Sequence, residues 1–279
     1  MADFPKLTVV VLALWAIAIL LLTINDMLYR LLEGYWGPFN RRSLRTEKTT
    51  QFGSAKTEIR QMYDTISTSG ASESTKNDYY KKQRQFGENW PAHEGLVLPS
   101  RFGNVIRAFE SYPYTVYGVD SIPVWPRLLA VVPKAFSGLL DGARAEVDFF
   151  VNLWLMAILA AGVAAARLAV ELTQVSQHQL GIAAVCWHFA IDAVIAAIVA
   201  WLAYEGAIYR ARSWGIFVKA AFDLYLPDLA RQLGYELAET LARRRAFWDS
   251  VNSMFLYQNP ILPDDWPVAE VVPETKDKK

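Results

Sequence analysis

The sequence predicts a mainly α-helical fold with three transmembrane helices, a helical and irregular cytoplasmic domain, and C-terminal amphipathic helices. Two observations predict this class: three apolar stretches are almost free of charge, and strongly polar segments lie between and after them. The average composition of 20% charged and 53% apolar residues hides this contrast. The 28 basic and 28 acidic residues balance, so net charge points to no polyanionic partner.

The first apolar stretch, residues 7–26, carries no charge before Asp26. It has about the 20 residues needed to cross a hydrocarbon core, and we expect residues 1–27 to form an N-terminal transmembrane anchor. A cleaved signal peptide is the alternative. The stretch is too long for a signal-peptide core, and Thr23-Ile24-Asn25 stands where a small-x-small cleavage site is needed.

Residues 149–205 predict a transmembrane helical hairpin, with spans at 149–172 and 180–204 and an uncharged turn at 173–179. A soluble helical hairpin is the alternative, but it would show a polar stripe along each helix. Neither segment has such a stripe.

The distribution of Lys and Arg at the span ends predicts the orientation, because cytoplasmic flanks retain these residues. Only Lys6 precedes the first span, and the hairpin turn has no Lys or Arg. The other flanks carry the basic residues: Arg30, Arg41, Arg42, Arg45, Lys134, Arg144, Arg210, Arg212 and Lys219. We therefore expect the N-terminus outside and the C-terminus in the cytoplasm. Arg167, near the outer end of the second span, is the exception, and its long stem could reach the headgroups.

The cytoplasmic parts comprise a domain at 28–148, amphipathic helices at 206–258, and a tail at 259–279. Residues 65–76 are small and hydroxylated, which predicts a flexible linker. Two helices are expected at 212–225 and 229–257, interrupted at Pro227. The proline-rich tail is expected to be disordered.

Residues 99–140 are the most distinctive segment. Pro99 and Ser100 predict the start of a helix over 101–112, which Pro113 should end. Residues 114–125 are aromatic and β-branched but interrupted by Gly and Pro, so an ordered loop or re-entrant turn is expected. Residues 128–140 are apolar but too short to span, and we expect them to lie on or dip into the cytoplasmic face of the membrane.

Two candidate sites emerge. His188 and Asp192 lie one helical turn apart within the third span, where a carboxylate costs about 3 kcal/mol. They could form a proton or ion path, or a polar pair that holds helices together. The second candidate is a possible anion-binding or partner-binding cluster with Arg guanidinium groups and aromatic neighbours. Its members are Arg101, Asn104, Arg107, Glu110, Asp120 and Arg127. The favoured alternative is a buried salt-bridge network that holds the loop to the membrane-proximal helices.

Other chemistry has no motif. The chain has no Gly-rich phosphate loop with its Lys, no H-E-x-x-H and no G-x-S-x-G. The single cysteine, Cys186, excludes an internal disulfide framework and a multi-cysteine metal site. No cofactor, no metal and no catalytic residue are predicted, and nucleic-acid binding lacks a recognisable module.

Three segments carry a resemblance: RFGNVIRAFESYPYTVYGVD at 101–120, WPRL at 125–128, and KAAFDLYLPDLARQL at 219–233. They resemble a group of uncharacterised bacterial multi-span membrane proteins with R-x-G-N-x-x-R-A, Y-G-x-D, W-P-R and A-F-D-L-Y-x-x-D-L segments. The resemblance covers about the C-terminal two thirds of the chain. It implies a bacterial inner-membrane location and a shared architecture, without an activity.

Three hypotheses follow for function. The leading one is a non-enzymatic membrane scaffold or accessory subunit, in contact with membrane lipids, whose cytoplasmic helices bind a protein partner or form a homo-oligomer. The second is small-solute or proton transport through His188 and Asp192. The third is a membrane-bound enzyme acting on lipid through Arg101, Asn104, Arg107 and Asp120.

Overall fold

The computed structural model describes residues 3–68, 71–178 and 183–258, and every regular element in these ranges is a helix. The order is α1 (Asp3–Glu33), the 3-10 turn η1 (Gly37–Phe39), α2 (Arg42–Thr68), α3 (Glu73–Asn89), the 3-10 turn η2 (Glu94–Leu96), α4 (Arg101–Glu110), α5 (Tyr112–Tyr117), α6 (Ser121–Val131), α7 (Lys134–His178), α8 (Ala183–Gln232) and α9 (Leu241–Tyr257). The predicted mainly α fold is confirmed.

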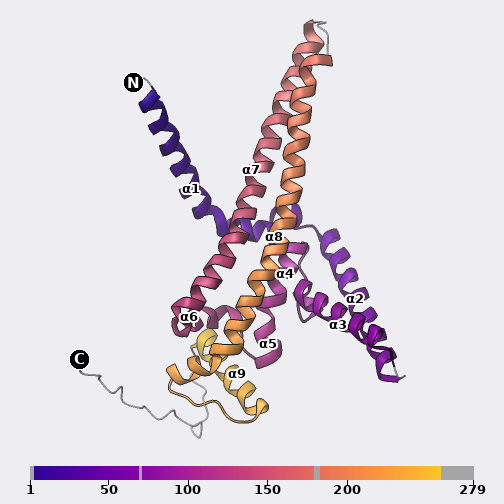
Figure 1. Cartoon of the computed structure of the whole chain (residues 1–279), viewed down its shortest axis with the longest axis vertical. Coiled ribbons are helices and arrows are strands. Elements are labelled where there is room, and N and C mark those ends of the chain that lie inside the picture. Colours follow the sequence, from indigo (N-terminus) through magenta and orange to yellow (C-terminus); the bar gives the residue numbers. More distant parts are fainter. Residues whose placement is uncertain (1–2, 69–70, 179–182, 259–279) are drawn as a thin grey trace, which may run out of the picture.

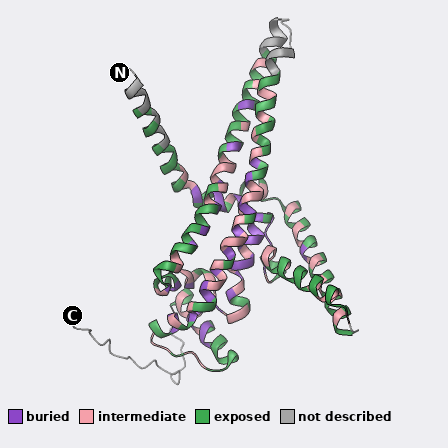
Figure 2. Ribbon diagram, in the orientation of Figure 1, coloured by how far each residue is buried: buried purple, intermediate pink, exposed green. Residues whose placement is uncertain are grey.

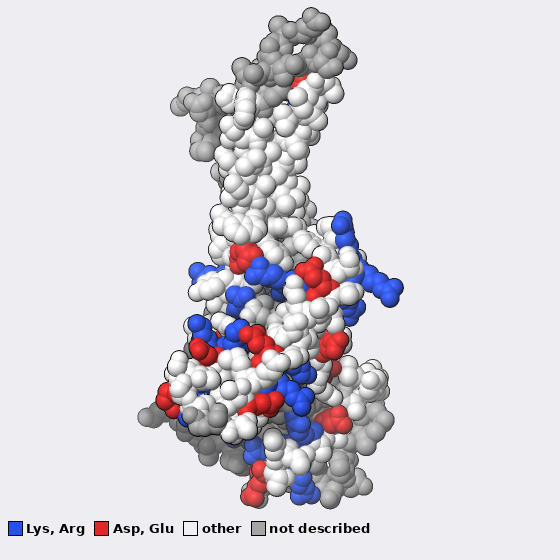
Figure 3. Space-filling view, turned by 90° about the vertical axis from the view of Figure 1, so that its right-hand side faces the viewer, with Lys and Arg blue, Asp and Glu red and all other residues white. Residues whose placement is uncertain are grey.

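Within the described residues, three helical segments are long and apolar enough to cross a membrane: Trp15–Phe39, Lys134–Thr173 and Trp187–Gln232. They belong to α1, α7 and α8. Helices α7 and α8 form a long hairpin, and α1 diverges from it above their common base (Figure 1). The shaft is almost free of charged side chains on the face seen in Figure 3, whereas charges of both signs gather over the base. This separation indicates a membrane location for the upper part of the molecule.

Small side chains line the contact between α7 and α8. Ala157 and Ala164 of α7 are buried, as are Ala200, Ala203 and Ala207 of α8. Such residues let two backbones approach closely, which is how membrane helices gain packing contacts without a hydrophobic driving force. We call this row of contacts the α7–α8 seam.

The base is a helical core made by the lower halves of α7 and α8 with α4, α5, α6 and α9 (Figures 1 and 2). Its largest fully buried side chains include Phe102, Leu128, Phe222, Phe247 and Trp248. Burying an apolar side chain of this size contributes roughly 1.5–3 kcal/mol relative to leaving it exposed. These residues form the apolar core of the protein, which lies in the base and not in the upper part of the α7–α8 hairpin.

Helix α1 is held at its C-terminal end. Leu28 and Leu32 are buried there, and the Tyr29 hydroxyl donates a hydrogen bond of 2.7 Å to Asp148 of α7. α4 crosses this end closely, because a Cβ on Gly103 would lie 2.5 Å from the carbonyl oxygen of Glu33. The upper part of α1 exposes apolar side chains, as expected for a helix that faces lipid.

The linker expected at 65–76 is largely helical in the structure, so this prediction was wrong for most of the segment. Helix α2 continues to Thr68 and α3 begins at Glu73, while residues 69–70 lie outside the described ranges. Ser72 caps α3 by accepting a hydrogen bond from the backbone N–H of Thr75 at 3.2 Å. Hydroxyl side chains that suggest a loop in sequence can also cap helices, and context decides between the two.

The loop or re-entrant turn expected at 114–125 is also wrong, because α5 and α6 occupy most of this segment. Pro113 lies in the first turn of α5, where its missing N–H costs nothing. Gly118 separates the two helices with a φ of 78°, a left-handed conformation that glycine adopts readily. The helix expected at 101–112 corresponds to α4, which Ser100 caps through a 2.9 Å bond from the N–H of Gly103.

Two further boundaries differ from the expectation. Residues 128–140 are divided between α6 and α7, with Leu128 and Leu140 buried in the protein core and Leu129 and Leu139 exposed. The expected helix at 212–225 is a continuation of α8, which passes through Pro227 and ends at Gln232, so the last helix begins only at Leu241. The tail at 259–279 and the side chain of Cys186 lie outside what the structure describes.

Candidate partner-binding cleft

Helices α2 and α3 form an arm of two polar helices that projects from the base (Figure 1). Phe52 of α2 is 2% exposed and holds the pair together. Its ring centroid lies 5.4 Å from that of Phe86 and 5.9 Å from that of Trp90. An ion pair of 2.7 Å between Lys82 and Glu58 joins the helices farther out.

Helix α8 holds the arm at one end. Arg212 donates two hydrogen bonds to the side-chain oxygen of Asn89, at 2.6 and 3.0 Å, and Lys219 donates one to the carbonyl of Gly87 at 3.1 Å. Both cations lie at the C-terminal end of α3, where free carbonyls and the helix dipole favour positive charge. The remainder of the arm stays clear of the body in Figure 1.

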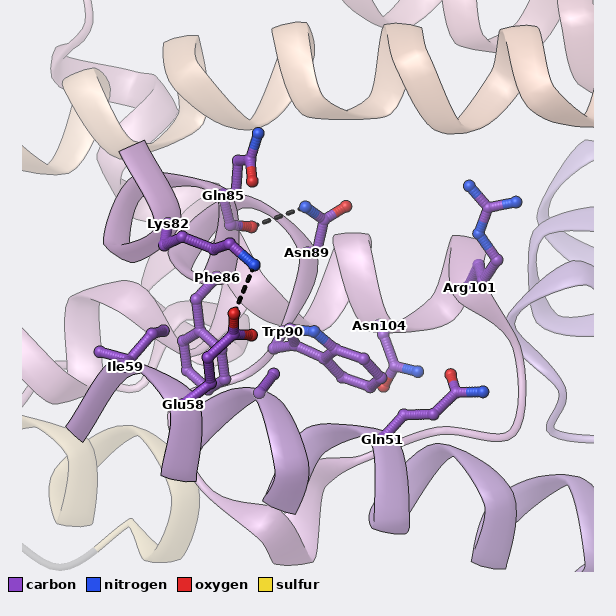
Figure 4. Close-up of a pocket in the computed structure, with 11 residues that line it drawn as sticks. Gln51, Glu58, Ile59, Lys82, Gln85, Phe86, Asn89, Trp90, Arg101 and Asn104 are labelled. Carbon is purple, nitrogen blue, oxygen red and sulfur yellow. Dashed lines mark hydrogen bonds and ion pairs between the residues drawn. The ribbon is translucent and has the colours of Figure 1, made fainter. Parts of the chain in front are cut away.

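A cleft of about 300 Å³ opens between α2, the C-terminal half of α3 and α4 (Figure 4). Its lining combines two aromatic rings, four amide side chains and charged groups at both ends. The lining residues are Gln51, Ala55, Glu58, Ile59, Lys82, Gln85, Phe86, Asn89, Trp90, Arg101 and Asn104.

The lining suits a peptide better than a small anion. Phe86 and Trp90 offer apolar surface, while the amides of Gln51 and Gln85 can each donate and accept hydrogen bonds. Lys82 is already paired with Glu58, which leaves little uncompensated positive charge at that end. Apolar surface beside amide donors and acceptors matches a segment of polypeptide with one apolar side chain.

The structure divides the predicted anion-binding or partner-binding cluster among three places. Arg101 and Asn104 line the cleft of the arm. Arg101 pairs with Glu205 of α8 at 2.5 Å. Asn104 is 1% exposed, and its side chain accepts a hydrogen bond from the N–H of Leu98 at 2.8 Å and donates to the carbonyls of Leu98 and Ser100 at 2.9 and 2.8 Å. Asn104 therefore closes the loop before α4.

Arg107, Glu110 and Asp120 line a second cleft of about 570 Å³ beside α4, which His93 also borders. Arg107 forms an ion pair of 3.1 Å with Glu110 and donates a hydrogen bond to the hydroxyl of Tyr35. The side chain of Asp120 caps α6 by accepting a bond of 3.1 Å from the N–H of Ile122.

Burial and neighbouring charges move the pKa of two groups in this second cleft. Burial raises the pKa of Glu110, and this effect together with the charge of Asp120 exceeds the lowering by Arg107. Burial lowers the pKa of Arg107, but Glu110 and Tyr35 raise it by more. Arg107 is thus a fixed cation among acidic and phenolic groups, which disfavours binding of an anion here.

Arg127 lies apart from both clefts. Its guanidinium is 3.8 Å from the ring centroid of Phe255 in α9, and it donates a hydrogen bond of 2.6 Å to the carbonyl of Pro123. The cation–π contact joins α6 to α9. Arg127 therefore contributes to packing of the base.

The sequence did not predict the hydrogen bonds that join α5 to α8. The hydroxyls of Tyr112 and Tyr117 both donate to one oxygen of Asp223 in α8, at 2.9 and 2.8 Å. Burial, together with these bonds to the carboxylate, raises the pKa of Tyr117 to about 12 and that of Tyr112 further. The A-F-D-L-Y segment carries this aspartate, but only the fold places it beside tyrosines more than 100 positions earlier.

Asn252 of α9 connects the same region to the C-terminus. Its side chain donates to the carbonyl of Gly118 at 2.7 Å and accepts from the N–H of Asp120 at 2.9 Å. Nothing in the spacing of the last helix marked this residue, since an asparagine in a helix usually faces solvent.

The intramembrane pair lies elsewhere. His188 and Asp192 are both exposed on α8, beside the α7–α8 seam rather than within it. The buried side chains at the α7–α8 contact are the alanines of the seam, and Asp192 is not among them. Neither residue lines a cleft named above.

Within the described residues, no group of three or more His, Cys, Asp or Glu side chains is placed to hold a metal ion. No protein-family model, curated protein or solved structure matches the chain.

Proposed function

We propose that this protein is a membrane-anchored scaffold or accessory subunit that binds a segment of a partner protein in the cleft of the α2–α3 arm. One observation carries the proposal: an open cleft lies where the arm meets α4 of the base, and its lining combines the rings of Phe86 and Trp90 with amide side chains. Aromatic residues and Arg are enriched at protein interfaces, and Phe86, Trp90 and Arg101 line the cleft.

The proposed setting is the bacterial inner (plasma) membrane, with the N-terminus outside and the base and arm in the cytoplasm. Two observations support this setting. The Lys and Arg residues at the span ends favour it, and so does the resemblance to bacterial multi-span membrane proteins. In this orientation the cleft is accessible to cytoplasmic partners.

Matched substitutions on α2 test the cleft. Ala55 lines it, whereas the neighbouring Ser54 is exposed and points elsewhere. Ala55→Asp places a carboxylate beside Glu58 in the cleft, and Ser54→Asp adds the same charge outside it. Purification in mild detergent from native membranes should recover a stoichiometric partner with wild type and with Ser54→Asp. That partner should be lost with Ala55→Asp.

Two outcomes would contradict the proposal. One is recovery of the wild-type chain without any stoichiometric protein. The other is equal loss or equal retention of the partner in both variants, because the cleft would then not be the binding surface.

Transport and lipid chemistry have less support. His188 and Asp192 are exposed beside a tightly packed seam, which does not suggest an enclosed path for a solute. The residues proposed for a lipid enzyme are divided between two clefts, and each makes a contact that holds the fold together.

A further inference from the structure

Among the side chains that the structure describes in the upper hairpin, Arg167 on α7 and His188 and Asp192 on α8 are exposed where a membrane would surround them, and Glu171 on α7 is half-buried. A carboxylate in a span costs about 3 kcal/mol unless it finds a partner. Among the ion pairs of the described residues, none includes Arg167 or Asp192. Exposed apolar side chains surround them, with Val163 57% and Ile195 54% exposed, and one polar group lies a turn away on each helix, Glu171 from Arg167 and His188 from Asp192.

The register of the hairpin places these groups at one height. The ring of Phe150 packs at Gly206, and Glu146 pairs with Arg210 at 2.9 Å. A step of four residues towards the C-terminus of α7 therefore corresponds to a step of four residues towards the N-terminus of α8. Arg167 lies 17 residues beyond Phe150, and Phe189 lies 17 residues before Gly206. His188 and Asp192 flank Phe189, and at about 1.5 Å per residue both lie within one turn of Arg167 in height.

The same groups share one face of the hairpin. At about 100° per residue, Arg167 is rotated about the α7 axis by about 60° from the buried Ala164, and Asp192 about the α8 axis by about 80° from the buried Ala200. Viewed from the N-terminus to the C-terminus of each helix, both rotations have the same direction. Because α7 and α8 run antiparallel, rotations in the same direction bring the two side chains to the same face of the hairpin.

We infer that this face pairs with the same face of a second copy of the chain, with Asp192 of each copy bound to Arg167 of the other. A two-fold axis along the membrane normal keeps every residue at its own height and places α8 of one copy against α7 of the other. Each interface then contains two complementary Asp–Arg pairs, and the four helices form an antiparallel bundle. His188, one turn from Asp192, lies beside each pair.

The charges account for the choice of occupant. A lipid chain offers no partner for a carboxylate, whereas a second copy supplies its Arg167 at the height of the first copy's Asp192 and its Asp192 at the height of the first copy's Arg167. This inference goes beyond the proposed function, because it concerns the membrane shaft and does not depend on the cleft of the arm.

Charge reversal in two separate chains tests the pairing. Asp192→Arg alone leaves two positive groups facing each other, and Arg167→Asp alone leaves two negative groups, so each variant should associate with itself at least about tenfold more weakly than wild type. A mixture of the two variants restores both pairs across the interface. The two full-length variants, each with a different fluorescent label, are reconstituted together in liposomes at low density. The efficiency of energy transfer between the two labels should then reach the level that differently labelled wild-type chains show.

The mixture separates this arrangement from a bond inside one chain. The double variant Asp192→Arg/Arg167→Asp in one chain restores either kind of pair and serves as the control for insertion. If the double variant associates but the mixture does not, or if wild type is monomeric in liposomes, the inference is overturned.

A second measurement covers the case in which single variants fail to insert. In a Cys186→Ala background, Val163→Cys in one chain and Ile195→Cys in another should form a disulfide between the two chains when they are reconstituted together. Absence of the cross-linked product under oxidising conditions that cross-link a control pair would also overturn the inference.

Discussion

Replacing Asn104 with alanine distinguishes a structural residue from a ligand-binding one. The side chain is 1% exposed and makes three hydrogen bonds to the loop before α4. Alanine would leave the N–H and the carbonyl of Leu98 without these partners, in a loop where Leu98 is 7% exposed. Ser100 keeps a partner for its carbonyl in the N–H of residue 104, at 3.2 Å.

The expected cost follows from these two groups. Each buried polar group left without a partner costs about 1–3 kcal/mol, so Asn104→Ala should lower the free energy of unfolding by about 3 kcal/mol. For a chain of this size the melting temperature should fall by about 6–12 °C. Thermal unfolding in lipid nanodiscs can be followed through the fluorescence of the 10 tryptophans.

Two controls make the result interpretable. Asn77 is exposed on α3, and Asn77→Ala should change the free energy by less than about 0.5 kcal/mol. Arg101→Ala breaks a half-exposed ion pair and should cost about 0–1 kcal/mol. If Asn104→Ala melts within about 2 °C of wild type, the closed loop does not stabilise the fold and the structural role of Asn104 is refuted.

Three more predictions follow from the base and the arm. Gly103→Ala should lower the free energy of unfolding by about 1–3 kcal/mol, since the added Cβ would lie 2.5 Å from backbone, whereas Gly53→Ala, with nothing within 4 Å, should raise it by about 0.5–1 kcal/mol. Equal shifts in thermal unfolding would contradict the close helix crossing. In an ultraviolet titration Tyr117 should stay protonated up to about pH 12, and stability should fall as pH rises from about 10 through that value; Asp223→Asn should lower this pKa, and an unchanged titration would refute the hydrogen bond. Because the pKa of Glu110 is raised in the folded state, its contribution to stability is present below the ordinary pKa of about 4.3 and is lost as pH rises through the folded pKa. Glu110→Gln should therefore make the melting temperature depend less on pH over this window. A profile identical to that of wild type would show that burial does not shift the pKa of this carboxyl.

The sequence predicted the membrane spans because length and hydropathy are local properties. An apolar run of about 20 residues has few soluble alternatives, and α1, α7 and α8 follow from that fact. The cap at Ser100 was also local, because a serine before an apolar helical pattern satisfies a free N–H. Residues 65–68, residues 73–76 and most of 114–125 were mispredicted because hydroxyl groups, glycine and proline are compatible with both helices and loops.

The candidate cluster illustrates the limit of local reasoning. Six residues close in sequence were expected to act together, but the turns of α4, α5 and α6 direct them to two clefts and to the ring of Phe255. The residues that complete these contacts, such as Glu205 for Arg101 and Asn252 for Asp120, are more than 100 positions away. Spacing along one helix cannot show which distant side chain will lie opposite.

The amino-acid sequence by itself determined that three apolar segments are long enough to span a membrane, that polar segments lie between and after them, and that each span is helical, because backbone groups in lipid must be satisfied within each segment. Only the tertiary structure decided that an alanine seam fills the hairpin contact and leaves Asp192 on an open face. Only it decided that α2 and α3 fold back on Phe52 to open a cleft. The reason is physical: helix formation depends on neighbours within a few residues, whereas these arrangements depend on contacts between helices that the chain brings together from distant positions.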